Sequence, residues 1–167
     1  MSAVVENHNH HDDHHHGPKK GIMRWLTTTN HKDIGTLYLW FSFAAFLLGG
    51  AFAMCIRAEL FEPGLQLMDP IRYNQLVTMH GLIMIFGGVM PAFVGLANWL
   101  IPLQIGAPDM AMPRMNNLSF WLLPTAFAIL LSTAFMEGGM PGFGWTFYAP
   151  LSTNYPNVAY FVFAMHI

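Results

Sequence analysis

The sequence predicts an all-α membrane protein, a polytopic bundle of transmembrane helices with three complete spans and the start of a fourth. Three observations predict this class. The 167 residues are 54% hydrophobic and only 10% charged, whereas soluble domains carry about 25% charged residues. The mean hydropathy is +0.39. The charges are also clustered, which leaves uncharged stretches long enough to cross a bilayer.

Four apolar stretches are the predicted spans. Residues 34–56 are uncharged and, at about 1.5 Å per residue, cover the roughly 30 Å of a hydrocarbon core. The next two spans are residues 74–100, where internal glycines and prolines are tolerated beside neighbouring helices, and residues 118–136. Residues 158–167 begin a fourth span and leave it incomplete.

The connecting segments carry loop signals. Pro63-Gly64 and Asp69-Pro70 lie between the first two spans, and three prolines lie in residues 101–117. We therefore expect loops over both segments.

The basic residues predict the orientation. Five of them flank one side of the predicted bundle: Lys19, Lys20, Arg24, Lys32 and Arg114. The opposite loops hold only Arg57 and Arg72. By the positive-inside rule, the N-terminus is expected on the cytoplasmic side of a bacterial-type inner (plasma) membrane.

Charge, cysteine content and the N-terminal segment exclude other classes. The formal net charge of −2 suggests no nucleic-acid partner, and the single cysteine, Cys55, excludes an intrachain disulfide. Residues 1–20 hold six of the nine histidines and lack the apolar core of a signal peptide. We expect a disordered cytoplasmic tail there, with residues 21–167 forming the membrane part.

One histidine, His80, lies inside the second predicted span, in the stretch "QLVTMHGLIMIFGG". Because lipid offers an imidazole no hydrogen-bond partner, another group must receive the ring. Three roles stay open on residue chemistry alone: a polar contact between helices, a proton relay, and a ligand to haem iron or another metal. Gly81 follows it, and its missing side chain would leave space for a flat macrocycle.

A carboxylate and several asparagines lie near the cytoplasmic end of the second span. Asp109 could collect protons from water, and Asn98, Asn116 and Asn117 could hold a file of water molecules. A loop carboxylate and a helix cap explain the same residues more simply, so spacing alone does not assign them a role.

Longer strings carry a resemblance to a known family. Residues 78–124, "TMHGLIMIFGGVMPAFVGLANWLIPLQIGAPDMAMPRMNNLSFWLLP", closely resemble subunit I of the haem–copper respiratory oxidases. The strings "NHKDIGTLYL", "IRAEL" and "GWTFYAPL" are similar as well. "NW" at 98–99 and "APDMA" at 107–111 resemble the cytochrome c oxidase branch. The resemblance covers only the first part of that family's chain, so we expect a fragment that is inactive alone.

The resemblance implies roles for single residues. His80 would be an axial ligand of a low-spin haem A, and Arg57 would bind the formyl group of that haem. Trp145 and Tyr148 match an outer loop near the haem propionates, where this chain has Ala149 in place of a family proline. A second haem A and a copper ion are expected only in the complete subunit.

The resemblance also implies a proton pathway and a cation site. Asp109 would be the mouth of the D pathway, with Asn98 and Asn116 as its next members. A candidate Ca²⁺ or Na⁺ site would involve Glu59, Gly64 and Gln66, because carboxylate and carbonyl oxygens suit a hard cation.

The implied activity belongs to a complete complex in a lipid bilayer. It would take electrons from cytochrome c, reduce O₂ to water and pump protons, with the remainder of subunit I and oxidase subunits II and III as partners. Two alternatives are a proton-coupled membrane transporter, with His80 and Asp109 as relay groups, and a membrane-anchored protein that binds metal through its histidine-rich tail.

Overall fold

The structure, a computed structural model, describes residues 21–167, and the predicted histidine-rich tail lies outside the described residues. Residues 21–167 contain helices and no β-strand. Three helical segments are long and apolar enough to cross a membrane: His31–Glu59, Pro70–Ile105 and Pro113–Phe135. The predicted class, an all-α bundle with three complete spans, is therefore confirmed.

The first span is one helix, whereas the second and third each join segments of different helical type. In chain order the elements are α1 (Ile22–Thr27), α2 (His31–Glu59), α3 (Pro70–Leu82), the π-helical η1 (Ile83–Val89), α4 (Met90–Ile105), α5 (Pro113–Ser132), the 3-10 helices η2 (Thr133–Phe135) and η3 (Leu151–Thr153), and α6 (Val158–His166).

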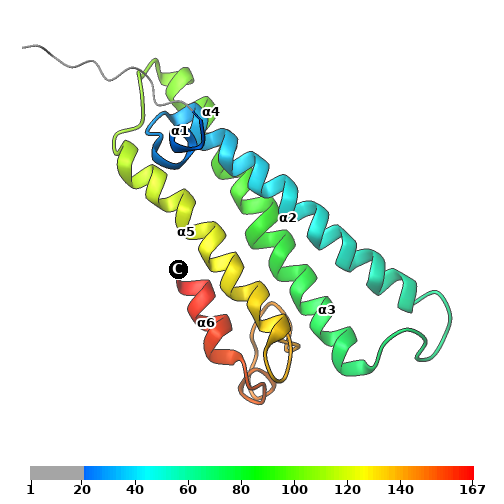
Figure 1. Cartoon of the computed structure of the whole chain (residues 1–167). Helices are drawn as coiled ribbons and strands as arrows, with labels where there is room; N and C mark the ends of the chain where they lie inside the picture. Colours follow the sequence, from blue (N-terminus) through cyan, green and yellow to red (C-terminus); the bar gives the residue numbers. More distant parts are fainter. Residues whose placement is uncertain (1–20) are drawn as a thin grey trace, which may run out of the picture.

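The spans lie side by side in alternating directions. Figure 1 shows α2 running antiparallel to the continuous α3–η1–α4 segment, with α5 beside that segment and the short α6 beside α5. The N-terminal end of α2 therefore lies beside the end of α4 and the start of α5. The opposite end of the bundle carries the α2–α3 loop.

The first two long helical segments begin earlier than the predicted spans because polar caps, not apolar content, set their ends. Asn30 caps α2 by accepting a hydrogen bond from the Lys32 N–H at 2.8 Å. Asp69 caps α3 in the same way, accepting from Arg72 N–H at 2.8 Å. Pro70 occupies the first turn, where its missing N–H costs nothing. The expectation that Asp69-Pro70 lies wholly in a loop was wrong, because this pair starts a helix.

The predicted loop over residues 101–117 is also shorter in the structure. Pro102 lies inside α4, which ends at Ile105 and is capped by Gly106 in the left-handed conformation with φ 69°. Pro113 opens α5. Proline was a misleading signal at both positions, since one is tolerated within a span and the other favours a helix start.

Glycines allow α2 and the second span to pack closely around η1. A Cβ at Gly49 would lie 2.7 Å from Met84 Sδ, and one at Gly87 would lie 2.9 Å from Ala45 Cβ on α2. Ser42 on α2 also donates a hydrogen bond to the Gly88 carbonyl of η1. These contacts fix α2 against the part of the second span that follows His80.

Most of the apolar surface faces outward. Only 17% of the most apolar part of α2 is buried, and Trp40 and Phe93 expose 66% and 69% of their surfaces. Such faces are unfavourable in water, so they are lipid-facing or meet other helices in the membrane.

Candidate functional site

The His80 ring forms a hydrogen bond between two spans. His80 Nδ1 lies 2.9 Å from the carbonyl oxygen of Gly49 on α2. A carbonyl can only accept, so Nδ1 carries the proton of the neutral ring. The lone pair then resides on Nε2, which has no hydrogen-bond partner within residues 21–167. The contact therefore presents Nε2 as a potential ligand.

This geometry bears on the three roles left open for His80. The polar contact between helices is present, because the Gly49 carbonyl receives the ring. The contact uses only Nδ1 of the ring. A histidine that binds a metal through one ring nitrogen commonly donates the N–H of the other to a carbonyl in this way. The helix contact and the ligand role are therefore compatible.

Arg57 lies in the last turn of α2, eight residues beyond Gly49 and hence about 12 Å further along the helix. Its side chain is exposed and makes no hydrogen bond or ion pair within the described part of the chain. The structure thus leaves the Arg57 guanidinium unpaired, on the same helix as the carbonyl that holds His80.

Trp145 packs against the helix that carries His80. The space that a Cβ at Gly81 would fill is bounded by the Trp145 side chain at 3.4 Å. The Thr78 hydroxyl accepts a 2.9 Å hydrogen bond from Gly144 N–H, which anchors the loop here. The expectation of open space at Gly81 was therefore wrong, because the loop folds back over it. The Tyr148 side chain is 75% exposed.

The Glu59 carboxylate closes the α2–α3 loop. Its Oε1 accepts from Gln66 N–H at 2.9 Å, and its Oε2 accepts from Leu67 and Met68 N–H at 2.7 and 3.1 Å. Gly64, with φ 107°, supplies the turn between them. These bonds give Glu59 a structural role in the loop.

The same residues were predicted as part of a Ca²⁺ or Na⁺ site. Among residues 21–167 there is no group of three or more His, Cys, Asp or Glu side chains that could hold a metal ion. A cation at Glu59, Gly64 and Gln66 would need carbonyl oxygens or further ligands, so the site stays a prediction.

Asp109, Asn98 and Asn116 meet at the other end of the bundle. Asn116 Nδ2 donates to Asn98 Oδ1 at 2.6 Å. His31 connects Asn98 with Asp109. Its Nδ1 lies 2.8 Å from the Asn98 carbonyl oxygen, and its backbone N–H donates to Asp109 Oδ1 at 3.3 Å. The three predicted residues therefore belong to one network.

His31 was missed by reasoning from the sequence. Its position directly after the capping Asn30 could have placed it at a helix start. Its partner Asn98 is 67 residues away, and a contact with a backbone carbonyl has no sequence signature. Both His31 and Asn98 are only 4% exposed, so the contact is part of the packed interior.

Two hydroxyls, Ser119 on α5 and Tyr38 on α2, extend the network. Ser119 Oγ donates to the Asn116 carbonyl at 2.7 Å. Since a hydroxyl has one proton, the Tyr38 hydroxyl, 2.9 Å away, donates to Ser119 Oγ. Tyr38 and Ser119 were not singled out from the sequence, although each is a polar residue in an apolar run.

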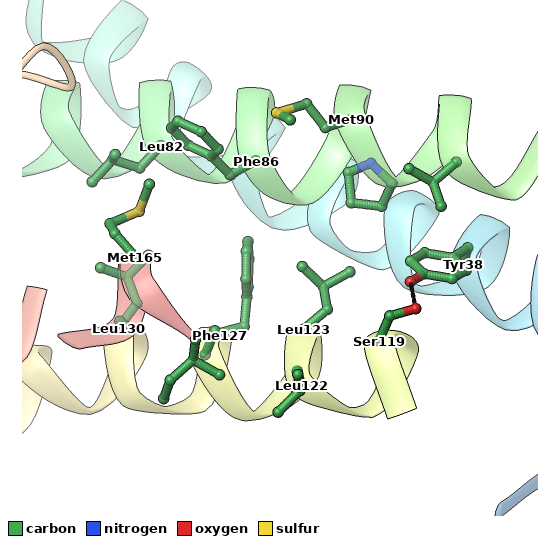
Figure 2. Close-up of a pocket in the computed structure, with 15 residues that line it drawn as sticks. Tyr38, Leu82, Phe86, Met90, Ser119, Leu122, Leu123, Phe127, Leu130 and Met165 are labelled. Carbon is green, nitrogen blue, oxygen red and sulfur yellow. Dashed lines mark hydrogen bonds between the residues drawn. The ribbon is translucent and has the colours of Figure 1, made fainter. Parts of the chain in front are cut away.

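Tyr38 and Ser119 lie at one end of a cavity of about 350 Å³ between the second span and α5 (Figure 2). The other labelled side chains around it are apolar, and Met165 of α6 borders the far end. The polar network therefore leads from Asp109 to an otherwise apolar cavity.

Two buried donors near this network lack partners. Asn117 Nδ2 and Trp121 Nε1 have no hydrogen bond within the described residues. Buried polar groups are usually satisfied by protein or ordered water. These two donors, one turn apart on α5, are therefore candidate positions for bound water beside the network.

The fold and the two polar sites define a multi-pass helical membrane protein with a ligand-competent histidine between two spans. Residues 33–167 match the family described as Cytochrome C and Quinol oxidase polypeptide I. The chain belongs to this family, and the predicted resemblance to oxidase subunit I is confirmed.

The names of similar curated proteins agree with this family membership. The chain is 50% identical over 136 residues to a Streptomyces avermitilis protein named for cytochrome c oxidase subunit 1-beta, covering 81% of this chain and 24% of that protein. It is 48% identical over 138 residues to cytochrome c oxidase subunit 1 of Corynebacterium efficiens, with coverage of 81% and 24%. The chain thus spans about a quarter of the length of these curated relatives.

Proposed function

We propose that this chain supplies two elements of a cytochrome c oxidase subunit I: an axial histidine for a low-spin haem A and the entrance of a proton pathway. In the complete complex, electrons from cytochrome c reduce O₂ to water, and protons are pumped. The observation that carries the proposal is the His80 Nδ1–Gly49 carbonyl bond, which leaves Nε2 free. The names of the relatives support the electron donor.

The chain prepares His80 for a metal-bound role. Haem A, when bound, supplies a redox-active iron whose potential depends on its axial ligands and their hydrogen bonds. The Gly49 carbonyl fixes the tautomer and orientation of the ring and increases the basicity of Nε2. Gly49 itself lets α2 approach the second span, since a Cβ there would contact Met84. Both features fit the ligand role.

The outer-side residues have supporting roles in this proposal. Arg57 would bind the haem formyl group, and its unpaired guanidinium supports this, because a cation at a membrane helix end favours a polar partner. Trp145 and Tyr148 would lie near the propionates. The second haem A and the copper ion belong to other helices of the complete subunit.

Asp109 would take up protons from the cytoplasm. The positive-inside rule orients this end of the bundle toward the cytoplasm. Asn98 and Asn116 would hold water without trapping a charge, and the Ser119 and Tyr38 hydroxyls continue the line toward the cavity. The chain of polar contacts supports this pathway over a simple loop role for Asp109.

The test of the ligand role is His80→Leu in the complete oxidase. We expect the low-spin haem A absorption band to be lost, because leucine offers no lone pair to iron. The matched control is Met79→Leu, a volume-conserving change at a fully buried neighbour, and it should keep the band. An unchanged low-spin spectrum in His80→Leu would rule out His80 as the ligand.

A further inference from the structure

The segment before α2 is anchored by polar contacts. Arg24 forms an ion pair with Asp33 at 2.9 Å. Thr28 Oγ1 donates to the same carboxylate at 3.1 Å, and Asn30 caps the helix. The first turn of α2 is therefore held in one position by contacts from both sides of the cap.

His31 follows the cap, so its backbone N–H has no partner inside the helix. It points to Asp109 Oδ1 at 3.3 Å, and Met110 N–H reaches the same oxygen at 2.8 Å. Asp109 Oδ2 has no hydrogen-bond partner within residues 21–167. The two N–H groups thus fix the rotation of the carboxylate and leave one oxygen open.

The His31 side chain forms a hydrogen bond with Asn98, the next residue of the network after Asp109. Its Nδ1 donates to the Asn98 carbonyl, while the Asn98 side chain accepts from Asn116. The ring is buried, with 4% exposure. One residue therefore contacts Asp109 through its backbone and Asn98 through its ring, and so sets the spacing between them.

We propose that His31 is the positioning residue of the proton entrance, holding the Asp109 carboxylate and Asn98 in register through its N–H and Nδ1–H. The proposal rests on the proposed function, in which Asp109 takes up protons. His31 does not carry the proton in this scheme. It keeps Asp109 Oδ2 open to water and the amide of Asn98 next to the point where the proton enters.

Two substitutions of His31 in the complete oxidase separate positioning from other roles. The amide nitrogen in His31→Asn lies near the position of Nδ1, whereas in His31→Gln it lies near that of Nε2. We expect His31→Gln to reduce proton-coupled turnover about 2- to 10-fold, the effect of one lost hydrogen bond. His31→Asn should stay close to the unmodified enzyme, and both should retain the low-spin haem spectrum.

Equal turnover in the two variants, whether normal or reduced, would overturn the proposal, because it requires a donor at the Nδ1 position. A second measurement adds His31→Gln to Asp109→Asn. The His31 ring contacts Asn98, whose position matters only when a proton enters through Asp109, so the double variant should be no slower than Asp109→Asn alone. A further, multiplicative loss would show that His31 acts independently.

The same variants test the proton entrance at Asp109 and the positioning role of His31 separately. Full proton uptake in Asp109→Asn would contradict the proposed entrance, and the positioning role with it. Impaired Asp109→Asn beside normal His31→Gln would overturn only the role of His31.

Discussion

At the scale of single residues, the sequence showed which side chains need partners but not what the partners are. His80 in an apolar span needs a hydrogen-bond partner, and that partner is the backbone carbonyl of Gly49. Every residue has such a carbonyl, so no sequence pattern could identify this one. What made it reachable is the missing side chain of Gly49, whose significance appears only when Met84 lies against it.

This close approach gives a prediction for Gly49→Ala. The new Cβ would lie 2.7 Å from Met84 Sδ and would push α2 away from the second span. We expect a loss of about 1–3 kcal/mol of stability, together with a shifted low-spin haem band, because the His80 hydrogen bond lengthens. Thermal loss of the haem spectrum in the detergent-solubilised complex measures both effects.

The control for Gly49→Ala is Gly50→Ala, because a Cβ at Gly50 meets nothing within 4 Å. Alanine is the better helix former by about 1 kcal/mol, so this variant should be at least as stable as the parent. Equal behaviour of the two variants would contradict the close-packing explanation.

At the scale of elements, the helices could be predicted well and their ends poorly. Apolar content located α2, the second span and α5 correctly, because each must cross the hydrocarbon core. The ends depend on caps such as Asn30 and Asp69, which extend helices into polar sequence. The π-helical η1 had no sequence signal beyond its glycines.

The α2–α3 loop gives the prediction at this scale. In Glu59→Gln an NH₂ group replaces one of the two carboxylate oxygens, so either the Gln66 N–H or the Leu67 and Met68 N–H groups lose their acceptor. We expect these amides to exchange hydrogen faster, with a stability loss of about 1–3 kcal/mol. Hydrogen-exchange mass spectrometry of the loop peptide checks the first, and thermal unfolding the second.

The matched control is Glu62→Gln in the same loop, where the side chain is exposed and makes no hydrogen bond among the described residues. It changes the charge by the same amount and should leave exchange unchanged. If both variants exchange alike, charge and not the three backbone contacts of Glu59 orders the loop.

At the scale of the whole molecule, the bundle separates two sites that the sequence places on one span. His80 lies in α3 and Asp109 just beyond α4, so the helical segment between them is about 37 Å long. The antiparallel α2 links both, with Gly49 toward one end and His31 at the other. The cavity in Figure 2 could not be predicted, since it arises from how α5 and α6 lie against the second span.

The separation predicts independent effects at the two ends. Asp109→Asn should reduce proton uptake and turnover at least tenfold, because an amide cannot take a proton from water at neutral pH, while the low-spin haem spectrum stays unchanged. Changes this far apart without shared partners behave independently. Proton uptake by oxidase in lipid vesicles and absorption spectra of the same sample make the comparison. Glu62→Gln is the control: it also removes one carboxylate, but an exposed one in the α2–α3 loop at the opposite end of the bundle, and it should retain the uptake. A perturbed haem spectrum in Asp109→Asn would mean that the bundle transmits the change along its length and that the two sites are not separate.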